Sequence, residues 1–222
     1  MQTNLSLARK NGGQSGAIKT LRTSTEGPLS VEIYATAQLP TRYGKFNIVA
    51  FINNRDAMEH VAIVHGQVAG VAAVLTRIHS ECLTGDVFGS LKCDCGPQLD
   101  VALEEIARRQ AGIILYMRQE GRGIGLANKI KAYSLQDGGL DTVEANQHLG
   151  FDDDLRNYEV SAEMLKLLGV QSIELMTNNP DKVDGLSAAG VIVTARCPIQ
   201  ILPNPFNLGY LETKRVKSGH LL

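Results

Sequence analysis

Three cysteines lie close together near the middle of the chain. Cys82 is followed, after a gap of ten residues, by Cys93-Asp94-Cys95. Two thiolates at positions i and i+2, with a third brought back across a loop, form a ligand set that suits zinc. Three protein ligands leave one coordination position for water, whose pKa zinc lowers from about 15.7 to about 7. The cluster therefore predicts hydrolysis at an electrophilic carbon.

The spacing leaves a second kind of zinc site open, a closed structural site in which His79 is the fourth ligand. Unligated buried cysteines are disfavoured because Lys92 and Asp94 are interleaved with them. A redox pair is disfavoured because Cys-x-Cys differs from the Cys-x-x-Cys of thioredoxin-like proteins. Cys197 stands alone and is predicted to be a small buried hydrophobe.

The sequence His79-Ser80-Glu81 directly precedes Cys82 and is similar to the H-x-E of nucleobase deaminases. In those enzymes the glutamate moves protons at a zinc site. The match is partial, because they continue with Pro-Cys-x-x-Cys. Both patterns nevertheless indicate hydrolysis at a carbon bonded to nitrogen.

A glycine-rich stretch with two arginines, Arg118-Gln-Glu-Gly-Arg122-Gly-Ile-Gly125, follows the apolar run 112–117 and leads into a predicted helix. Such a turn can hold a phosphate on its backbone N–H groups. It does not match the dinucleotide pattern, because Leu126 stands where a third glycine is needed. Solvent-facing arginines at a glycine-rich helix start are the alternative.

Two further cations stand at unusual places. Lys182 lies in the first turn of a helix that Asn179 is predicted to cap and Pro180 to begin, where a cation opposes the helix dipole unless an anion is bound. An ordinary surface lysine is the alternative. Arg77 interrupts the apolar run 71–79, so we expect it to face a ligand or an acid.

The elements that position these residues follow from the apolar pattern. Residues 1–30 show no apolar period and are predicted to be a flexible N-terminal tail, and 31–222 a single compact catalytic domain. The runs 31–37, 45–52, 61–66 and 71–79 predict a mostly antiparallel or barrel-like β section. Strands and helices then alternate, which predicts an α/β fold with α+β character. We expect helices at about 98–110, 124–137, 159–168 and 180–189, strands at 112–117, 172–176 and 191–195, and a short polar helix within the last twenty residues.

The composition excludes several classes of protein. The 222 residues include 22 Lys and Arg against 23 Asp and Glu, which excludes a strongly basic nucleic-acid coat. Aromatic residues make up only 5%, so stacking platforms for nucleic acid are poorly supplied. No apolar run is long enough for a membrane span or a secretory signal. We therefore expect a cytoplasmic protein with a small ligand and neither nucleic acid nor membrane as partner.

Five motifs in shared order make the chain resemble GTP cyclohydrolase II over about residues 38–222. They are Arg77-Ile-His-Ser-Glu-Cys82-Leu-Thr-Gly-Asp86, Lys92-Cys-Asp-Cys-Gly96, Arg118-Gln-Glu-Gly-Arg122, Thr142-Val-Glu-Ala-Asn146 and Thr177-Asn-Asn-Pro180. The resemblance implies that the imidazole ring of GTP is opened, that C8 leaves as formate, and that pyrophosphate is released. The implied product is 2,5-diamino-6-ribosylamino-4(3H)-pyrimidinone 5′-phosphate, used in riboflavin synthesis or a related pathway.

The resemblance also implies ligands and roles. One Zn²⁺ per subunit would lie on Cys82, Cys93 and Cys95, Mg²⁺ would accompany the GTP phosphates, and the protein would be a homodimer. Residues implied to be catalytic are Asp154, Arg156 and Tyr133. Those implied to bind GTP are Arg77, Ile78, His79, Ser80, Glu81, Gln98, Glu120, Gly121, Arg122, Thr142, Thr177 and Lys182. Arg156 matches the nucleophile assigned in the family, but a guanidinium is better suited to stabilising phosphoryl charge, so its role stays open.

Three other functions are weighed against this one. A related zinc cyclohydrolase could stop at a formylated product or keep the pyrophosphate, which the presence of Tyr133, Asp154 and Arg156 disfavours. A binding module with a closed structural zinc would bind GTP without turning it over. A nicotinamide-dependent oxidoreductase is suggested only by the glycine-rich turn.

Overall fold

The computed structural model describes residues 27–222 except 57 and 153. Most of the predicted tail, residues 1–26, lies outside the described residues. Its last four residues run beside the turn after the second strand, where Asn54 Nδ2 donates to the Pro28 carbonyl at 2.9 Å and Arg55 Nη1 to the Gly27 carbonyl at 2.8 Å. The backbone N–H of Ser30 in turn donates to Asn54 Oδ1 at 2.8 Å.

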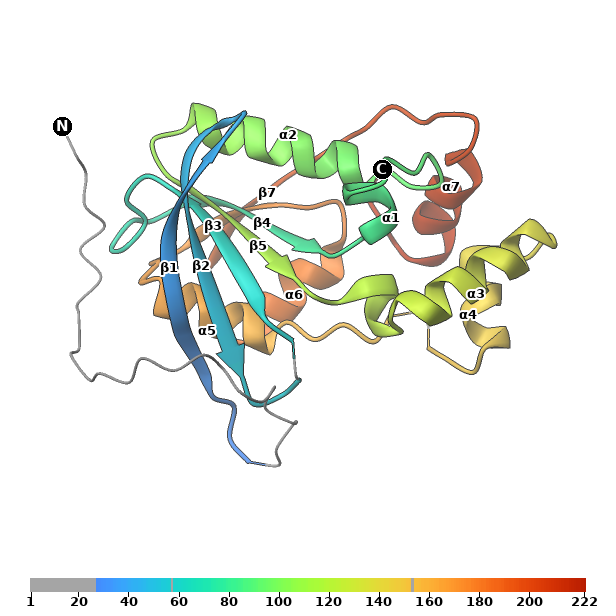
Figure 1. The fold of residues 1–222 in the computed structure, drawn as a ribbon, viewed down its shortest axis with the longest axis horizontal. Helices are drawn as coiled ribbons and strands as arrows, with labels where there is room; N and C mark the ends of the chain where they lie inside the picture. The colour runs from blue at the N-terminus through green and yellow to red at the C-terminus, as the bar shows by residue number, and fades with distance from the viewer. Residues whose placement is uncertain (1–26, 57, 153) are drawn as a thin grey trace.

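A seven-stranded mixed sheet forms the centre of the described chain, with strand order β1-β2-β3-β5-β4-β6-β7 (Figure 1). The strands are β1 (Val31–Thr41), β2 (Gly44–Asn53), β3 (His60–His65), β4 (Val74–Ser80), β5 (Gly112–Met117), β6 (Ile173–Met176) and β7 (Val193–Cys197). Strands β1, β2, β3 and β5 pair antiparallel, whereas β5, β4, β6 and β7 pair parallel. The predicted α/β class with an antiparallel N-terminal section is confirmed.

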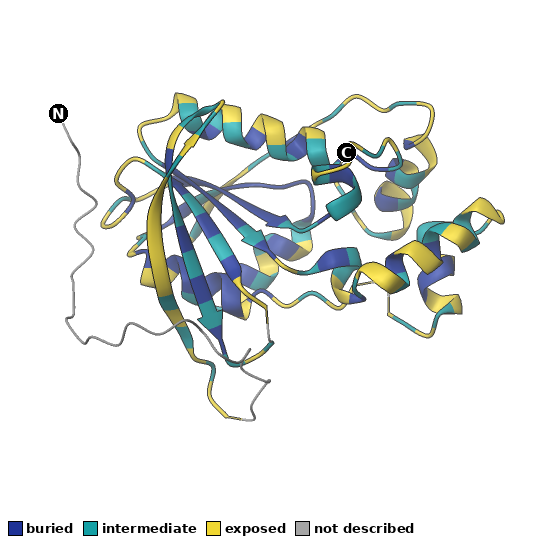
Figure 2. Cartoon of the chain, in the orientation of Figure 1, coloured by how far each residue is buried: buried dark blue, intermediate teal, exposed yellow. Residues whose placement is uncertain are grey.

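The two predicted sections share one sheet, which corrects the expectation that residues 71–79 belong to a separate antiparallel or barrel-like unit. Strand β4 lies between β5 and β6 and is parallel to both. Six of its seven residues are buried (Figure 2). Strands covered on both faces in this way are typical of a parallel sheet.

Helices cover both faces of the sheet (Figure 1). Helix α2 (Cys95–Arg108) packs Ala102 and Ile106 against one face, and α5 (Glu159–Leu167) and α6 (Pro180–Ala188) cover the other. The remaining helical elements are α1 (Leu83–Asp86), the 3₁₀ turn η1 (Glu120–Gly123), α3 (Leu126–Asp137), α4 (Thr142–His148) and α7 (Leu208–Lys217). Helices α3, α4 and α7 lie beyond the carboxyl ends of β4 and β5 (Figure 1).

The predicted cap of α6 is confirmed: Asn179 Oδ1 accepts the Asp181 N–H at 3.0 Å and Pro180 is the first helical residue. Helix α4 was not predicted, because it has only seven residues and no apolar period. Asp141 caps it, accepting the Val143 and Glu144 N–H groups. No helix in the described part of the chain has both the length and the apolar character needed to cross a membrane.

Candidate active site

A pocket opens where β4, β5 and β6 end, at the carboxyl edge of the parallel strands. In open α/β sheets this edge is the usual place for a ligand, because the loops that follow neighbouring strands meet there. Lining residues include Arg77 within β4, Glu120 after β5 and Thr177 after β6. The loops that carry the sequence motifs are therefore brought together by the sheet.

The three cysteines predicted to bind metal meet at one side of this pocket. The Sγ atoms of Cys82, Cys93 and Cys95 lie within 4.8 Å of one another. Gly85 makes room for them, since a Cβ there would lie 2.8 Å from Cys93 Sγ. Hydrogen bonds from Cys93 and Cys95, together with the nearby Lys129 ammonium, hold the pKa of the Cys82 thiol well below its usual range. A low thiol pKa favours the thiolate, which is the form that binds metal, so the donor set fits zinc.

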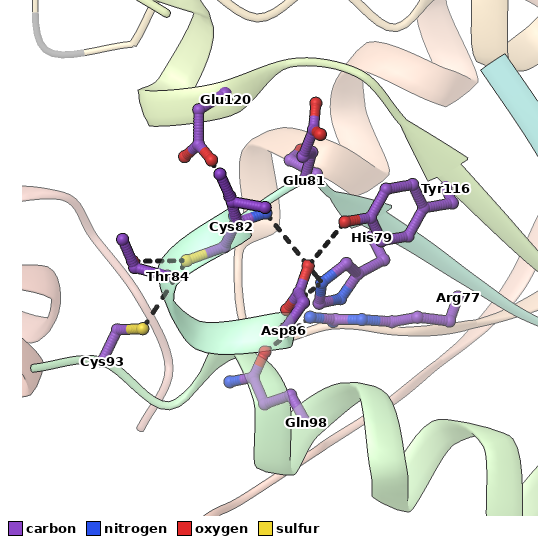
Figure 3. Close-up of polar contacts among 12 residues, drawn as sticks. Arg77, His79, Glu81, Cys82, Thr84, Asp86, Cys93, Gln98, Tyr116 and Glu120 are labelled. Atoms are coloured by element: carbon purple, nitrogen blue, oxygen red, sulfur yellow. Dashed lines mark hydrogen bonds and ion pairs between the residues drawn. The ribbon is translucent and has the colours of Figure 1, made fainter. Parts of the chain in front are cut away.

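The geometry does not support a closed site with His79 as fourth ligand. Among the described residues, the three cysteines alone form the candidate metal group. His79 Nε2 lies 3.0 Å from both carboxylate oxygens of Asp86, as the dashed lines of Figure 3 show. Asp86 also accepts the Tyr116 hydroxyl at 2.9 Å and the Cys82 N–H at 3.0 Å. Asp86 thus holds His79 and Cys82 in place at once.

Burial lowers the pKa of His79, so the imidazole is neutral at neutral pH. Its Nε2–H donates to the Asp86 carboxylate, which leaves Nδ1 as an acceptor. That atom is buried and has no hydrogen-bond partner among the described residues. A buried polar atom of this kind is expected to meet a ligand group or a water.

Glu120 and Lys129 form a buried ion pair beside the cysteines. Lys129 Nζ donates to Glu120 Oε1 at 2.7 Å and to Cys82 Sγ at 3.1 Å. Glu120 also accepts the Leu83 N–H at 2.7 Å and the Gly121 N–H at 2.9 Å. Burial opposes the charge on Lys129, but the hydrogen bond to Glu120 and the interactions with Cys82 together outweigh it and raise the lysine pKa above its usual value. The pair fixes the start of α1 and the turn η1 relative to the cysteines.

Arg77 is buried, as its position in an apolar run suggested, and donates to two neutral groups. Its Nη1 lies 2.8 Å from the Met176 carbonyl and its Nη2 2.5 Å from Gln98 Oε1. Burial lowers its pKa to about 10, so the guanidinium stays charged at neutral pH. Its buried Nε has no partner among the described residues. The positive charge faces a pocket able to take an anion.

Lys182 is also buried, which corrects its alternative interpretation as a surface lysine. Its Nζ donates to the Ile78 carbonyl at 2.8 Å. Burial, followed by repulsion from Arg156 and Arg77, lowers its pKa well below the usual value. Several cations therefore share one small volume, and a bound polyphosphate would relieve their repulsion.

Arg156 and Asp154 form a two-point ion pair at the edge of the pocket. Arg156 Nε lies 2.7 Å from Asp154 Oδ1, and its Nη2 also contacts this carboxylate. Burial opposes the guanidinium charge, but the hydrogen bonds to Asp154 raise its pKa above the usual value. A permanently protonated guanidinium has no lone pair with which to attack, so its chemistry is that of a charge-stabilising donor. Its Nη1 reaches Ser80 Oγ at 3.4 Å.

Tyr133 lies on α3 and turns its hydroxyl toward the cysteines. The hydroxyl is 3.3 Å from Thr84 Oγ1, which is itself 3.7 Å from Cys82 Sγ. Burial raises the pKa of Tyr133, so at neutral pH the phenol is a proton donor. A donor beside the three cysteine sulfurs can stabilise charge on a reacting oxygen.

Most of the residues singled out in the sequence line this one pocket. The exceptions are Ile78, whose side chain is buried in the core, and Asp154, which reaches the pocket only through Arg156. Sequence reasoning did not assign to the site a further group of lining residues, some within the quoted motifs, some on α3 and some in the C-terminal segment. They are Gln119, Ile124, Lys129, Ala132, Gln136, Asn146, Asn178, Asn179, Tyr210, Lys214 and His220. Lys129 gave no local signal, because the helix buries it while apolar Leu126 and Ile130 are exposed.

A family model described as GTP cyclohydrolase II matches residues 32–198. The chain is 55% identical over 184 residues to the riboflavin biosynthesis protein RibBA of Bacillus mycoides (strain KBAB4), covering 83% of the chain and 46% of the relative. It is 50% identical over 207 residues to RibBA of Endomicrobium trichonymphae, with 93% and 51% covered. For RibBA of Bacillus subtilis (strain 168) the identity is 54% over 193 residues, with 86% and 48% covered. The chain spans about half the length of these relatives.

Proposed function

The chain belongs to the GTP cyclohydrolase II family, and we propose that it opens the imidazole ring of GTP with release of formate and pyrophosphate. The product is 2,5-diamino-6-ribosylamino-4(3H)-pyrimidinone 5′-phosphate, a step of riboflavin synthesis as in the names of its relatives. The observation that supports this most is the meeting of three cysteine sulfurs with a set of buried cations in one pocket. Ring opening needs water activation, and a triphosphate needs the cations.

Cys82, Cys93 and Cys95 would hold one Zn²⁺ per subunit. Zinc bound there supplies Lewis acidity and lowers the pKa of water at neutral pH. Tyr133 donates a proton or hydrogen bond on the same side of the pocket, through the hydroxyl that faces Thr84. The neutral His79 offers Nδ1 as an acceptor to a ligand group.

The phosphate chain would lie among the cations. We assign Arg77, Arg122 and Lys182 to its binding, and Arg156, oriented by Asp154, to the phosphorus at which pyrophosphate leaves. Arginine fits this task because its planar donors match phosphate oxygens and it stays charged. Mg²⁺ would enter with the triphosphate, because hard oxygen ligands favour it.

The remaining residues assigned to GTP are Ser80, Glu81, Gln98, Glu120, Gly121, Thr142 and Thr177, all of which line the pocket, together with Ile78, whose carbonyl holds Lys182. Two of them act through neighbours. Gln98 accepts from Arg77 and donates to Asp94, and Glu120 accepts from Lys129 and from two backbone N–H groups. Substituting either one would move the cations and cysteines as well as any contact with GTP.

The experiment incubates zinc-loaded protein with GTP and Mg²⁺ and follows formate, pyrophosphate and the pyrimidine by mass spectrometry. Formate and pyrophosphate are expected to appear together, and Cys93→Ser is expected to lose zinc and both products. Cys197→Ser is the matched control, because Cys197 lies outside the pocket lining. Bound but intact GTP on a protein that keeps its zinc would refute the proposal and support a binding module.

We also propose a cytoplasmic homodimer in which residues 31–222 form the catalytic domain. Free thiols suit a reducing compartment. Exposed apolar side chains support the dimer: Asn204 Nδ2 donates to the Leu91 carbonyl at 3.3 Å and so joins the segment after α1 to the segment that leads into α7, and both carry large exposed apolar side chains. These side chains are Val87, Phe88, Leu91, Leu202, Phe206 and Leu208. Light scattering on the wild type and on Phe206→Asp measures the oligomeric state. A monomeric Phe206→Asp variant is expected, and a variant that stays dimeric would show that Phe206 is not in the interface.

A further inference from the structure

The C-terminal segment, defined as α7 with residues 218–221, forms one wall of the pocket. It lies beyond residue 198, where the family match ends, and it contains none of the motifs described above. Three of its side chains nevertheless line the pocket: Tyr210, Lys214 and His220. A helix far along the chain from the cysteines and cations therefore contributes to the same site.

Polar contacts at both ends tie this segment to the rest of the site. Lys214 Nζ donates to Asp94 Oδ1 at 3.1 Å, between the two neighbouring cysteines, and both side chains are buried. The Leu221 N–H donates to the Asn178 carbonyl at 2.8 Å, in the loop before α6. His220 lies between these two anchors, and its own N–H donates to the Lys214 carbonyl at 3.1 Å. The backbone thus holds His220 over the pocket.

The His220 imidazole lines the same pocket as cations that come from four different elements. Burial, and then the positive charges around it, lower its pKa to about 3, so it is neutral at neutral pH. The charges that act on it are Lys214 on α7, Arg122 in η1, Arg156 in the loop before α5 and Lys182 on α6. The nearby acids are already paired, Asp94 with Lys214 and Asp154 with Arg156.

No hydrogen bond joins the His220 imidazole to another side chain in the described part of the chain. An anion bound among the four cations would supply the missing partner. It would also favour protonation of the ring, because a nearby negative charge stabilises imidazolium. The phosphate chain is the anionic part of a purine triphosphate, so the ring is placed for phosphate and not for the base.

Resting on the proposed function, we propose that His220 is a substrate-binding residue that contacts the phosphate chain, held in place by the C-terminal segment. Lys214 then acts as a positioning residue, because its charge is spent on Asp94 and on the Tyr210 ring, whose centroid lies 4.3 Å from Nζ. The segment completes a pocket that the five motifs leave open on one side.

Calorimetry on the zinc-loaded protein tests the proposal with three probes: GTP, inorganic tripolyphosphate and guanosine. His220→Ala is expected to raise the dissociation constants of GTP and tripolyphosphate by about tenfold or more, as for loss of a hydrogen bond to a charged group. The guanosine affinity is expected to stay unchanged. His148→Ala is the matched control, since His148 is exposed and lies outside the pocket lining.

A second measurement separates a direct contact between His220 and the phosphate chain from an effect of His220 on the shape of the pocket. GTP binding to the wild type near pH 6.5 is expected to take up a proton, seen as a dependence of the heat on the buffer, and His220→Gln is expected to lose this uptake. Zinc content and melting temperature confirm that each variant is folded. GTP and tripolyphosphate affinities within twofold of wild type, or an equal loss for guanosine, would overturn the proposal.

The outcome also distinguishes failure of this inference from failure of the proposed function. A wild type that binds tripolyphosphate through His220 but releases no formate would refute the cyclohydrolase reaction and leave the phosphate contact standing. A wild type that releases formate, with His220→Ala binding GTP normally, would do the reverse.

Discussion

The stability of the structure around the cysteines depends on the buried ion pair between Glu120 and Lys129. The two side chains are 9% and 11% exposed, and Lys129 Nζ lies 2.7 Å from Glu120 Oε1. Lys129→Met keeps much of the side-chain length and removes the charge. The Glu120 carboxylate then stays buried without its cation, and Cys82 Sγ loses a donor at 3.1 Å.

The size of the effect follows from these contacts. Removing one partner of a buried ion pair costs about 3–5 kcal/mol. The cost here falls below that range because Glu120 keeps the N–H groups of Leu83 and Gly121 and retains slight exposure. We therefore expect Lys129→Met to lower the free energy of unfolding by about 2–3 kcal/mol. A loss of this size is a large part of the about 5–15 kcal/mol that stabilises a folded domain.

Urea unfolding followed by circular dichroism at pH 7 measures this loss, with a chelator present so that metal binding does not contribute. Lys131→Met, on an exposed lysine of the same helix, is the control and is expected to change the free energy by less than about 0.5 kcal/mol. Adding Glu120→Gln to Lys129→Met is expected to recover about 1 kcal/mol, because no charge is then left unpaired. Equal effects of Lys129→Met and Lys131→Met, or no recovery in the double variant, would refute the reasoning.

Three further changes test other parts of the structure. Gly85→Ala places a Cβ 2.8 Å from Cys93 Sγ and is expected to weaken zinc binding at least about tenfold in a chelator competition, whereas unchanged affinity would show that the thiols move apart freely. Asn179→Ala removes the cap of α6 and is expected to cost about 1 kcal/mol in urea unfolding, and a cost below about 0.3 kcal/mol would contradict the cap. Because His220 has a pKa of about 3 when folded and about 6.5 when unfolded, the wild type is expected to lose stability as pH falls below about 6.5. His220→Gln removes that loss, up to about 1 kcal/mol at pH 5.5, so parallel stability curves for the two proteins would count against the buried neutral ring.

Elements with strong local signals were predicted closely. Helix α5 was expected at 159–168 and spans Glu159–Leu167, because its apolar period is regular and Gly169 follows it. The start of α2 was placed three residues late, at 98 and not Cys95. Asp94 makes no side-chain cap bond there, so no cap signal marks the first turn. Local sequence patterns predict the bounds of a helix accurately only where capping residues mark its ends.

Local sequence patterns could not predict which groups the buried cations contact. Arg77 was expected to face a ligand or an acid, and the structure gives it the Met176 carbonyl, ninety-nine positions away, and Gln98. For Lys182 the sequence allows either a phosphate ligand or a surface lysine, and the structure buries it, with its Nζ on the Ile78 carbonyl a hundred and four positions away. Such contacts depend on strand order, which the apolar period of each strand does not encode.

Residue types and their spacing along the chain are enough to identify the local chemistry: three thiols at ligand spacing, a glycine-rich turn between arginines, a capped helix with a lysine in its first turn, and the motifs of one family. Side-chain type and near-neighbour spacing are sufficient for those statements. Only the folded chain shows that β4 is a central parallel strand, that Asp86 binds His79, and that the C-terminal segment brings His220 to the pocket that the cations line. These features arise from packing between segments far apart in the chain, where the hydrophobic effect favours burial without specifying which partners meet.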